Sequence, residues 1–273
     1  MEIRFLGTAA FEGIPSLFCR CPLCVKAGEA GGKEIRSRTS VMLDDELKID
    51  FPPDTFMHMI RDRLDLEKIK DLIFTHSHSD HLYADDLVAR LPGYARSADH
   101  PIEVYANDAV LVRIKQALDV NGGAQGKFNL HRLRPFERTQ LQTAVVVPLP
   151  ASHDPLETCL LYYIEKDGKT LLYGHDSGWF PEETWQWLQD KRLDLAVLEC
   201  TVGQINYRQS HMNVDAVLET KQRFEEYGML KPDARIVVTH FSHNAQLSHT
   251  DLVNMFTPHG IQVAYDGMVL ELP

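Results

Sequence analysis

The sequence predicts a layered α/β domain with partly antiparallel sheets, and three observations lead to this fold class. Short apolar runs recur along the chain, segments of helical periodicity lie between several of them, and tight-turn signals join others into hairpins. Strands connected through helices favour parallel pairing, whereas hairpins require antiparallel pairing. A chain with both is expected to bury its strands between layers of helices. Because its 273 residues show no repeat or linker, we expect one domain spanning 1–273.

The apolar runs that we expect to be strands each end in a small group of His, Asp or Cys residues. They are DLIFTHSHSDH (71–81), AVVVPLPASHD (144–154), TLLYGHDSG (170–178), LDLAVLECT (193–201) and RIVVTHFSH (235–243). Loops at strand ends are where α/β proteins carry their chemistry, because those loops are not constrained by the core. The pattern therefore predicts a functional site at one rim of the sheets.

Helices are expected between these runs, and their ends carry recognisable capping residues. The expected segments are 84–91, 107–120 with Asn107 as N-cap, 181–192 opened by Pro181, and 213–228 with Asn213 as N-cap. Hairpins are expected at 41–50, at 162–174 and at 264–272, the last two around Asp-Gly turns. The glycine-containing stretch 121–142 is either a loop over the site or a surface excursion, and we favour the excursion.

Charge and hydropathy argue against several classes of partner. The net charge of −11 is opposite to the basic surface that nucleic-acid binding requires, so we expect no nucleic-acid partner. No apolar stretch approaches the ~20 residues that span a bilayer, and the N-terminus lacks the apolar core of a signal peptide. We therefore expect a cytoplasmic protein that does not bind membranes.

The segment THSHSDH (75–81) concentrates metal-binding side chains directly behind an apolar run. His76 and His78 alternate along an extended stretch, so both can point the same way. Asp80 and His81 follow a turn and would face a second position. Imidazole and carboxylate are ligands that zinc and manganese accept, and one metal cannot use all four side chains at this spacing. The segment therefore predicts a binuclear metal site.

Each metal needs further ligands, and the other strand ends supply candidates. They are His153 in PLPASHD, Asp176 in YGHDSG and His240 in VVTHFSH. Any one of these alone would be an ordinary capping or core residue. Together, in order and behind apolar strands, they support the metal site.

These residues resemble the HxHxDH signature and the later ligands of the metallo-β-lactamase superfamily. The resemblance implies a four-layer αββα sandwich of two mixed β-sheets flanked by helices. It also implies that Asp50 lies behind the metal ligands and orients them, although Phe51-Pro52-Pro53 follows it where the family has a small residue. The implied ligands are His76, His78 and His153 for the first metal, Asp80, His81 and His240 for the second, and Asp176 as the bridge.

A cluster of thiols in FCRCPLC predicts a separate zinc site. The chain has five cysteines, an odd number that does not suit a disulfide framework. Cys19, Cys21 and Cys24 would supply three zinc ligands from a loop at about 19–24, and His243 is a candidate fourth ligand. The alternative is three small buried residues in an N-terminal loop. Such a structural zinc would stabilise the fold and take no part in the chemistry.

The thiol cluster, together with PLPASH, THFSH and the closing YDGM, resembles one branch of that superfamily in particular. This is the phosphoribosyl 1,2-cyclic phosphodiesterase of the carbon–phosphorus lyase pathway and its relatives. The resemblance implies a binuclear phosphodiesterase that hydrolyses a small cyclic phosphate or phosphodiester through a metal-bridging hydroxide. It also implies His211 as the general acid, and we place Asp80 beside His211 among the catalytic residues. The active-site metals would be Mn²⁺ or Zn²⁺, and a homodimer is one arrangement that the branch suggests.

Other functions remain open at this point. A hydrolase of another branch would cleave a thioester, lactone or β-lactam, and a tRNA-processing enzyme would need a basic surface. A non-enzymatic binding or carrier module would be expected to have lost metal ligands. The sequence does not name the small phosphorylated substrate, and Arg208 is only a guess at a phosphate contact. His175 and Asp266 are read as structural residues, Asp266 as part of a turn.

Overall fold

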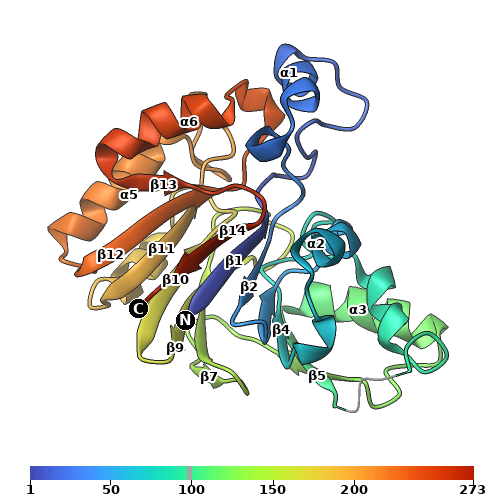
Figure 1. Ribbon diagram of the computed structural model, residues 1–273. Coiled ribbons are helices and arrows are strands. Elements are labelled where there is room, and N and C mark those ends of the chain that lie inside the picture. The colour runs from blue at the N-terminus through green and yellow to red at the C-terminus, as the bar shows by residue number, and fades with distance from the viewer. Residues whose placement is uncertain (97–99) are drawn as a thin grey trace.

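A computed structural model describes residues 1–96 and 100–273, and within them the chain forms two seven-stranded sheets that pack face to face (Figure 1). Each sheet is mixed, because one half pairs antiparallel and the other half pairs parallel. Helices lie on the outer faces of both sheets (Figure 1). The predicted fold class, a sandwich of two mixed sheets flanked by helices, is confirmed.

The first sheet has the strand order β14-β1-β2-β3-β4-β5-β6. Its strands are β14 Met268–Glu271, β1 Glu2–Gly7, β2 Ser40–Leu43, β3 Leu47–Ile49, β4 Asp71–Ile73, β5 Ile102–Ala106 and β6 Phe128–Arg132. The second sheet has the order β13-β12-β11-β10-β9-β8-β7. Its strands are β13 Ile261–Val263, β12 Leu230–Thr239, β11 Leu193–Glu199, β10 Lys169–Gly174, β9 Leu160–Lys166, β8 Val145–Pro150 and β7 Thr139–Gln140.

Helices follow several of the parallel strands, and short 3₁₀ turns fill the connections. The α-helices are α1 Pro22–Ala30, α2 Thr55–Asp62, α3 Asp108–Val120, α4 Glu182–Leu188, α5 Val214–Glu226 and α6 His249–Phe256. The 3₁₀ helices are η1 Gly32–Glu34, η2 Leu66–Lys68, η3 Ala84–Arg90, η4 His243–Ala245 and η5 Thr257–His259. The predicted N-caps Asn107 and Asn213 are confirmed, because each side chain accepts a hydrogen bond from the first turn of its helix.

The alternation of side chains along each strand divides the apolar interior into layers. On β11, Leu195 and Val197 pack between the two sheets, whereas Ala196 and Leu198 pack against the helices outside. On β4, Ile73 likewise faces the other sheet, and Leu72 faces the layer that contains α3 and η3. Because both faces of these strands are buried, their central residues are apolar, as the sequence pattern indicated.

Three expectations about local structure were wrong. The segment 264–272 is no hairpin: β13 belongs to the second sheet and β14 to the first, so the Asp-Gly turn carries the chain from one sheet to the other. The stretch 121–142 is no simple surface excursion, because it contains the edge strands β6 and β7. The segment 84–91 forms the 3₁₀ helix η3, whose N-terminus lacks a capping side chain.

The hairpins at 41–50 and 162–174 are confirmed as the antiparallel pairs β2–β3 and β9–β10.

Among the residues that the structure describes, the helices are too short or too polar to cross a lipid bilayer.

Candidate metal centre and active site

The candidate site lies where the parallel strands of both sheets end. β3 and β4 of the first sheet lead into Asp50 and into the segment 75–81, and β8, β10 and β12 of the second lead into His153, Asp176 and His240. Parallel strands present their carboxyl ends at one edge, so segments far apart in the sequence meet there. The structure therefore brings together all of the active-site ligands that the sequence predicted.

Three of these residues have an unusual backbone conformation. The φ angles of Asp50, Asp176 and His240 are 61°, 58° and 59°. Residues with a Cβ avoid this left-handed region, which costs about 1–2 kcal/mol per residue. The conformation ends each strand sharply at the site. Strain of this kind gathers at functional sites, where the surrounding structure holds it in place.

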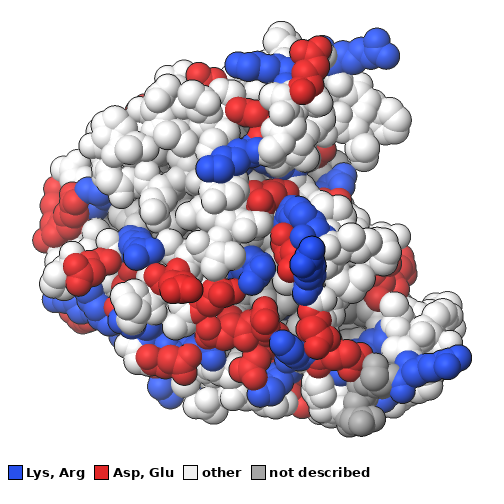
Figure 2. All heavy atoms as spheres, in the orientation of Figure 1, with Lys and Arg blue, Asp and Glu red and all other residues white. Residues whose placement is uncertain are grey.

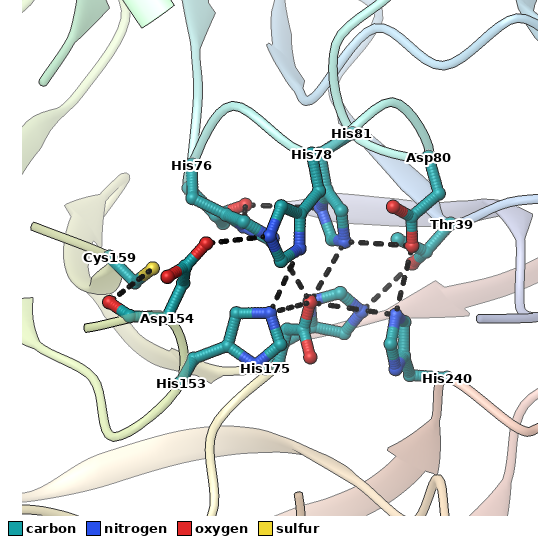
Figure 3. A network of polar contacts seen from close by, with 12 residues as sticks. Thr39, His76, His78, Asp80, His81, His153, Asp154, Cys159, His175 and His240 are labelled. Carbon is teal, nitrogen blue, oxygen red and sulfur yellow. Dashed lines mark hydrogen bonds and ion pairs between the residues drawn. The ribbon is translucent and has the colours of Figure 1, made fainter. Parts of the chain in front are cut away.

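The side chains form two groups that share Asp176. The ligand atoms of His76, His78, His153 and Asp176 all lie within 4.8 Å of one another, and so do those of Asp80, His81, Asp176 and His240. Oδ2 of Asp176 lies 3.3 Å from Nε2 of His76, 3.4 Å from Nε2 of His153, 3.0 Å from Nε2 of His81 and 3.7 Å from Nε2 of His240. The rings of His76, His78, His81, His153 and His240 surround this common centre in Figure 3.

Behind each group, hydrogen bonds fix the orientation of the rings. Nδ1 of His81 donates to Oδ2 of Asp50 at 2.7 Å. Asp50 also accepts from the backbone N–H of Thr75 at 2.8 Å and from its hydroxyl at 2.9 Å. The Thr75 hydroxyl lies 3.1 Å from Nδ1 of His76. Asp50 thus lies directly behind His81, in the position that the family resemblance implied.

The other rings are held in the same way, each by one nitrogen. Nε2 of His78 donates to Asp154 at 2.9 Å (Figure 3), and Nδ1 of His153 donates to the carbonyl of Ser210 at 3.1 Å. Nδ1 of His240 lies 2.7 Å from the Thr201 hydroxyl. One nitrogen of each ring is therefore occupied outside the centre, and the other faces the centre, where Nδ1 of His78 and Nε2 of His153 lie 3.1 Å apart.

Several buried atoms at the centre form no well-aligned hydrogen bond among the described residues, although an ion-pair partner lies within 4.0 Å of each. They are Nε2 of His76, His81 and His240 and Oδ1 of Asp176. A buried polar atom without a partner is strongly unfavourable, and native proteins avoid it unless an ion or water is bound. Imidazole nitrogens and carboxylate oxygens are the donors that divalent metals take. The donor set therefore fits a pair of divalent cations.

The protonation states of His76 and Asp80 agree with this fit, whereas His81 would have to lose a proton to bind a metal. Burial works against protonation of His81, but the charges of Asp80 and Asp50 raise its pKa well above its usual range. Burial and the nearby His81 lower the pKa of His76 well below its usual range, so its ring is neutral, as a metal ligand must be. Burial works against ionisation of Asp80, but the charge of His81 and the hydrogen bonds from His240 and His81 outweigh it. They hold the pKa of Asp80 well below its usual value. The carboxylate therefore stays anionic.

His211 lies beside this centre, on the loop before α5, and its side chain is 24% exposed. Its Nδ1 is 3.0 Å from Oε1 of Glu199 and 3.1 Å from Oδ1 of Asp176. Burial lowers the pKa of His211, but the charge of Glu199 and the hydrogen bonds to both carboxylates outweigh burial and raise it to about 11. The ring is therefore an imidazolium at neutral pH, as a general acid requires.

Glu199 is a functional candidate that the sequence reasoning missed. It ends β11 with its side chain fully buried, and its second oxygen accepts the backbone N–H of Thr201 at 2.9 Å. The signal was present in LDLAVLECT, where a carboxylate follows an apolar strand as in the other runs. Only the fold shows that this carboxylate faces His211.

The centre opens into a cavity of about 390 Å³. Besides the predicted residues, its wall includes Phe11, Glu12 and Arg113, which the sequence did not single out. Arg208, which the sequence offered as a phosphate contact, lies outside this cavity. It pairs with Glu219 at 2.6 Å, so the guess that it contacts phosphate is not supported.

The hydrogen bonds of Asp266 and His175 indicate a structural role for both residues. Asp266 does lie in a turn, but its nearly buried carboxylate also accepts hydrogen bonds from Thr8 at 2.8 Å and from the backbone of Ser37 at 2.8 Å. It therefore ties the C-terminal turn to two N-terminal segments. His175 is buried beside Asp176, and its Nε2 lies 2.9 Å from the Thr39 hydroxyl.

The predicted zinc ligands also come together. Nδ1 of His243 is 3.5 Å from Sγ of Cys19 and 3.6 Å from Sγ of Cys21, and with Cys24 the ligand atoms all lie within 4.8 Å of one another. Burial works against ionisation of Cys21, but hydrogen bonds from Gln246 and His243 lower its pKa to about 6. A thiolate grouped with further thiols and an imidazole fits Zn²⁺.

Comparison with known proteins agrees with this architecture. Residues 49–241 match the family model described as a beta-lactamase superfamily domain. No curated protein matches the sequence. Several similar solved structures cover essentially the whole of both chains. A diphosphatase from the PhnP family has 25% identity and a TM-score of 0.77, covering 100% of this chain and 98% of that chain.

Two more distant structures share the fold. Zn²⁺-bound PqqB from Methylobacterium extorquens has 17% identity and a TM-score of 0.72, and the short form of human tRNase Z (ELAC1) has 20% and 0.71. Each comparison covers 100% of both chains. Because the family model matches more than half of the chain, the protein belongs to the beta-lactamase superfamily and is a hydrolase of the metallo-β-lactamase fold.

Proposed function

We propose that the protein is a binuclear metal-dependent phosphodiesterase that hydrolyses a small cyclic phosphate or phosphodiester. The observation that carries the proposal is the pair of His/Asp groups joined through Asp176, with His211 beside them. The similarity to a diphosphatase of the PhnP family supports phosphorus chemistry as the reaction type.

The two groups would each hold one divalent metal, Mn²⁺ or Zn²⁺, and Asp176 would be shared between them. When bound, such a pair lowers the pKa of coordinated water and neutralises charge on a phosphoryl group. The chain contributes the rigid frame. Asp50 and Asp154 orient His81 and His78 and so hold these ligands toward the centre.

His211 would protonate the departing oxygen. An alkoxide leaves slowly unless an acid supplies a proton in the transition state. Because Nδ1 of His211 is directed to Glu199, its Nε2–H is the proton available to the leaving group. Glu199 does not touch the substrate in this scheme. It acts as a positioning residue that fixes which nitrogen faces the reaction.

A structural zinc held by the Cys₃His group would stabilise the N-terminal loop. His243 follows His240 by three residues, so this zinc would also anchor the strand end that carries an active-site ligand. Its role would be in folding, because none of its ligands lines the cavity of the metal centre.

The size and charge of the molecule favour a small substrate over a nucleic acid. The cavity of about 390 Å³ is of small-molecule size. On the face shown in Figure 2, Lys and Arg side chains are interspersed with Asp and Glu. This mixed surface and the net charge of −11 distinguish the chain from a protein that grips RNA phosphates.

The test is hydrolysis of two diesters by metal-stripped protein reloaded with Mn²⁺ or Zn²⁺. One is bis(p-nitrophenyl) phosphate, whose leaving group departs without a proton, and the other is a ribonucleoside 2′,3′-cyclic phosphate, whose leaving group is an alkoxide. We expect metal-dependent turnover of both, and His211→Ala should slow the cyclic phosphate by about 10²- to 10⁴-fold and the aryl diester much less. Full metal loading without turnover of either would reject the proposal and direct attention to thioesters and lactones.

A further inference from the structure

One buried amine near the metal centre has no role in the mechanism above. Lys48 is the middle residue of β3, and its side chain is fully buried. Its neighbours Leu47 and Ile49 face the other sheet. Lys48 therefore points the other way, beside Met42 and Leu72 of the outer apolar layer. Burial lowers the pKa of its amine to about 7, and a lysine is almost never buried in this way for packing alone.

The amine of Lys48 is not explained by an ion pair. Among residues 1–96 and 100–273, no carboxylate oxygen lies within 4.0 Å of its Nζ. Lys166, which is also nearly buried, pairs by contrast with Asp44 at 3.3 Å and with Asp167 at 3.4 Å. Ion pairing therefore accounts for the burial of Lys166 and leaves that of Lys48 to be accounted for by other contacts.

The contacts of Lys48 gather at the turn that ends β3. Its Nζ donates to the backbone carbonyl of Asp50 at 2.7 Å and to the hydroxyl of Ser40. That hydroxyl in turn donates toward the carbonyls of Ile49, at 2.8 Å, and of Asp50, at 3.0 Å. Asp50 has the left-handed φ of 61°, a conformation that persists only where the surroundings hold it. The amine of Lys48 is therefore one of the groups that hold this turn.

The same turn is hydrogen-bonded to the segment that carries the metal ligands. The carboxylate of Asp50 accepts from Nδ1 of His81 at 2.7 Å and from the N–H of Thr75 at 2.8 Å. The backbone of Phe51 bonds to this segment as well. Its N–H donates to the carbonyl of His81 at 2.7 Å, and its carbonyl accepts from the N–H of Tyr83 at 2.7 Å. A shift of the turn would therefore move His81, a ligand of the second metal group.

Phe51 is also the residue at which the sequence departs from the small residue that the family resemblance leads us to expect. Its ring is nearly buried in the same outer apolar layer, and Nζ of Lys48 lies 5.4 Å from the ring centroid. Lys48 and Phe51 thus flank Asp50 in the sequence and are neighbours in space. The support of the turn by these two side chains is a feature of this chain.

We propose that Lys48 is a positioning residue of the metal centre, which fixes the turn at Asp50 and thereby the orientation of His81. This inference rests on the binuclear centre of the proposed function and does not depend on the phosphodiester chemistry. Loss of the amine should weaken metal binding by the second group more than by the first. It should not weaken the fold, because an apolar side chain of similar length would occupy the outer layer without the cost of burying an amine.

The test measures metal affinity and stability on the same metal-stripped proteins. Calorimetry at pH 7 follows the binding of Mn²⁺, which favours oxygen and nitrogen ligands over thiolates, and urea titration gives the free energy of unfolding. The variant is Lys48→Met. Lys166→Met is the matched control, since it removes a nearly buried lysine outside the cavity. Asp50→Ala, alone and combined with Lys48→Met, shows whether Lys48 acts through Asp50.

We expect Lys48→Met to bind one Mn²⁺ nearly as the unchanged protein does and the other about 10- to 100-fold more weakly, the usual effect of removing a residue that orients a metal ligand. Its free energy of unfolding should equal or exceed that of the unchanged protein. Lys166→Met should keep both affinities. In the Asp50→Ala background, Lys48→Met should add little further loss, because two residues that act by one route are not additive.

Unchanged affinity for both metals in Lys48→Met overturns the inference, and so does an equal loss at both. A lower free energy of unfolding or a failure to fold also overturns it, because Lys48 would then serve the fold. An undiminished loss in the Asp50→Ala background would mean that Lys48 does not act through Asp50. Fewer than two Mn²⁺ in the unchanged protein would reject the binuclear centre itself. Because no turnover is measured, failure of the phosphodiester chemistry would leave these results unaffected.

Discussion

Replacing Glu199 with glutamine tests whether this buried carboxylate controls the acid function of His211. Oε1 of Glu199 lies 3.0 Å from Nδ1 of His211, and the pKa of His211 is raised to about 11. At an effective dielectric constant of about 20, opposite charges at 3.0 Å attract by roughly 5 kcal/mol, which corresponds to roughly 4 pKa units. Removal of the charge should therefore lower the pKa of His211 to roughly 7.

The assay is the pH dependence of kcat between about pH 6 and 10, with metal-loaded protein and the two diesters described above. A general acid must be protonated, so loss of its proton slows the reaction as pH rises through its pKa. In Glu199→Gln, His211 would be about 1% protonated at pH 9, and hydrolysis of the cyclic phosphate should fall about 100-fold there. At pH 6 the variant should resemble the unchanged protein. Glu199→Asp, which restores the charge, should recover much of the activity at high pH.

Two results would refute this reasoning. An unchanged pH profile in Glu199→Gln would mean that Glu199 does not set the pKa of His211. An equal loss for the cyclic phosphate and the aryl diester would mean that the variant damages the metal centre or the fold, because the aryl leaving group needs no proton. Asp71→Asn serves as the control for burial, since Asp71 is a buried carboxylate that binds Thr143 outside the cavity.

Three further predictions address the metal sites and stability. Asp176→Asn should lose more than one equivalent of active-site metal, because both groups share this carboxylate. Elemental analysis measures the metal content, and loss of a single metal would contradict the shared role. Cys21→Ser should remove one zinc and lower the melting temperature, while the other metals remain bound; unchanged zinc content would show that the Cys₃His group is not a zinc site. Burial lowers the pKa of Lys48 to about 7, so between pH 7 and its ordinary value near 10 the unfolded chain binds the extra proton. The free energy of unfolding should therefore rise with pH in that window, by up to about 5 kcal/mol. Urea titrations of Lys48→Met should lack this rise. If both proteins show the same rise, groups other than Lys48 cause it.

Local sequence patterns were sufficient to identify the candidate metal ligands. His76, His78, Asp80 and His81 lie in one short segment, so their chemistry is visible without the fold. The more distant ligands could be found because each follows an apolar run, and parallel strands bring their carboxyl ends to a common edge. Helix caps were predictable for a similar reason, since Asn107 and Asn213 bind backbone groups only three residues away.

Such local patterns could not predict to which sheet each strand belongs or which strand lies beside it. The Asp-Gly turn before β14 is a valid local hairpin signal, yet it joins two different sheets. A turn signal reports the conformation of a few residues. Which strand then lies alongside is decided by how the two sheets bury their apolar faces against each other, and that depends on the whole chain.

The sequence by itself thus determined the fold class, the candidate metal ligands and the thiol cluster, because each is expressed in spacing along the chain. Only the tertiary structure decided which further side chains meet at the metal centre. Glu199 faces His211, and Arg113 reaches the carbonyl of Ser77, because separate strands and helices converge on one rim. Contacts of this kind leave no periodic pattern in the sequence, since the partners are placed by packing and are not set by their distance along the chain.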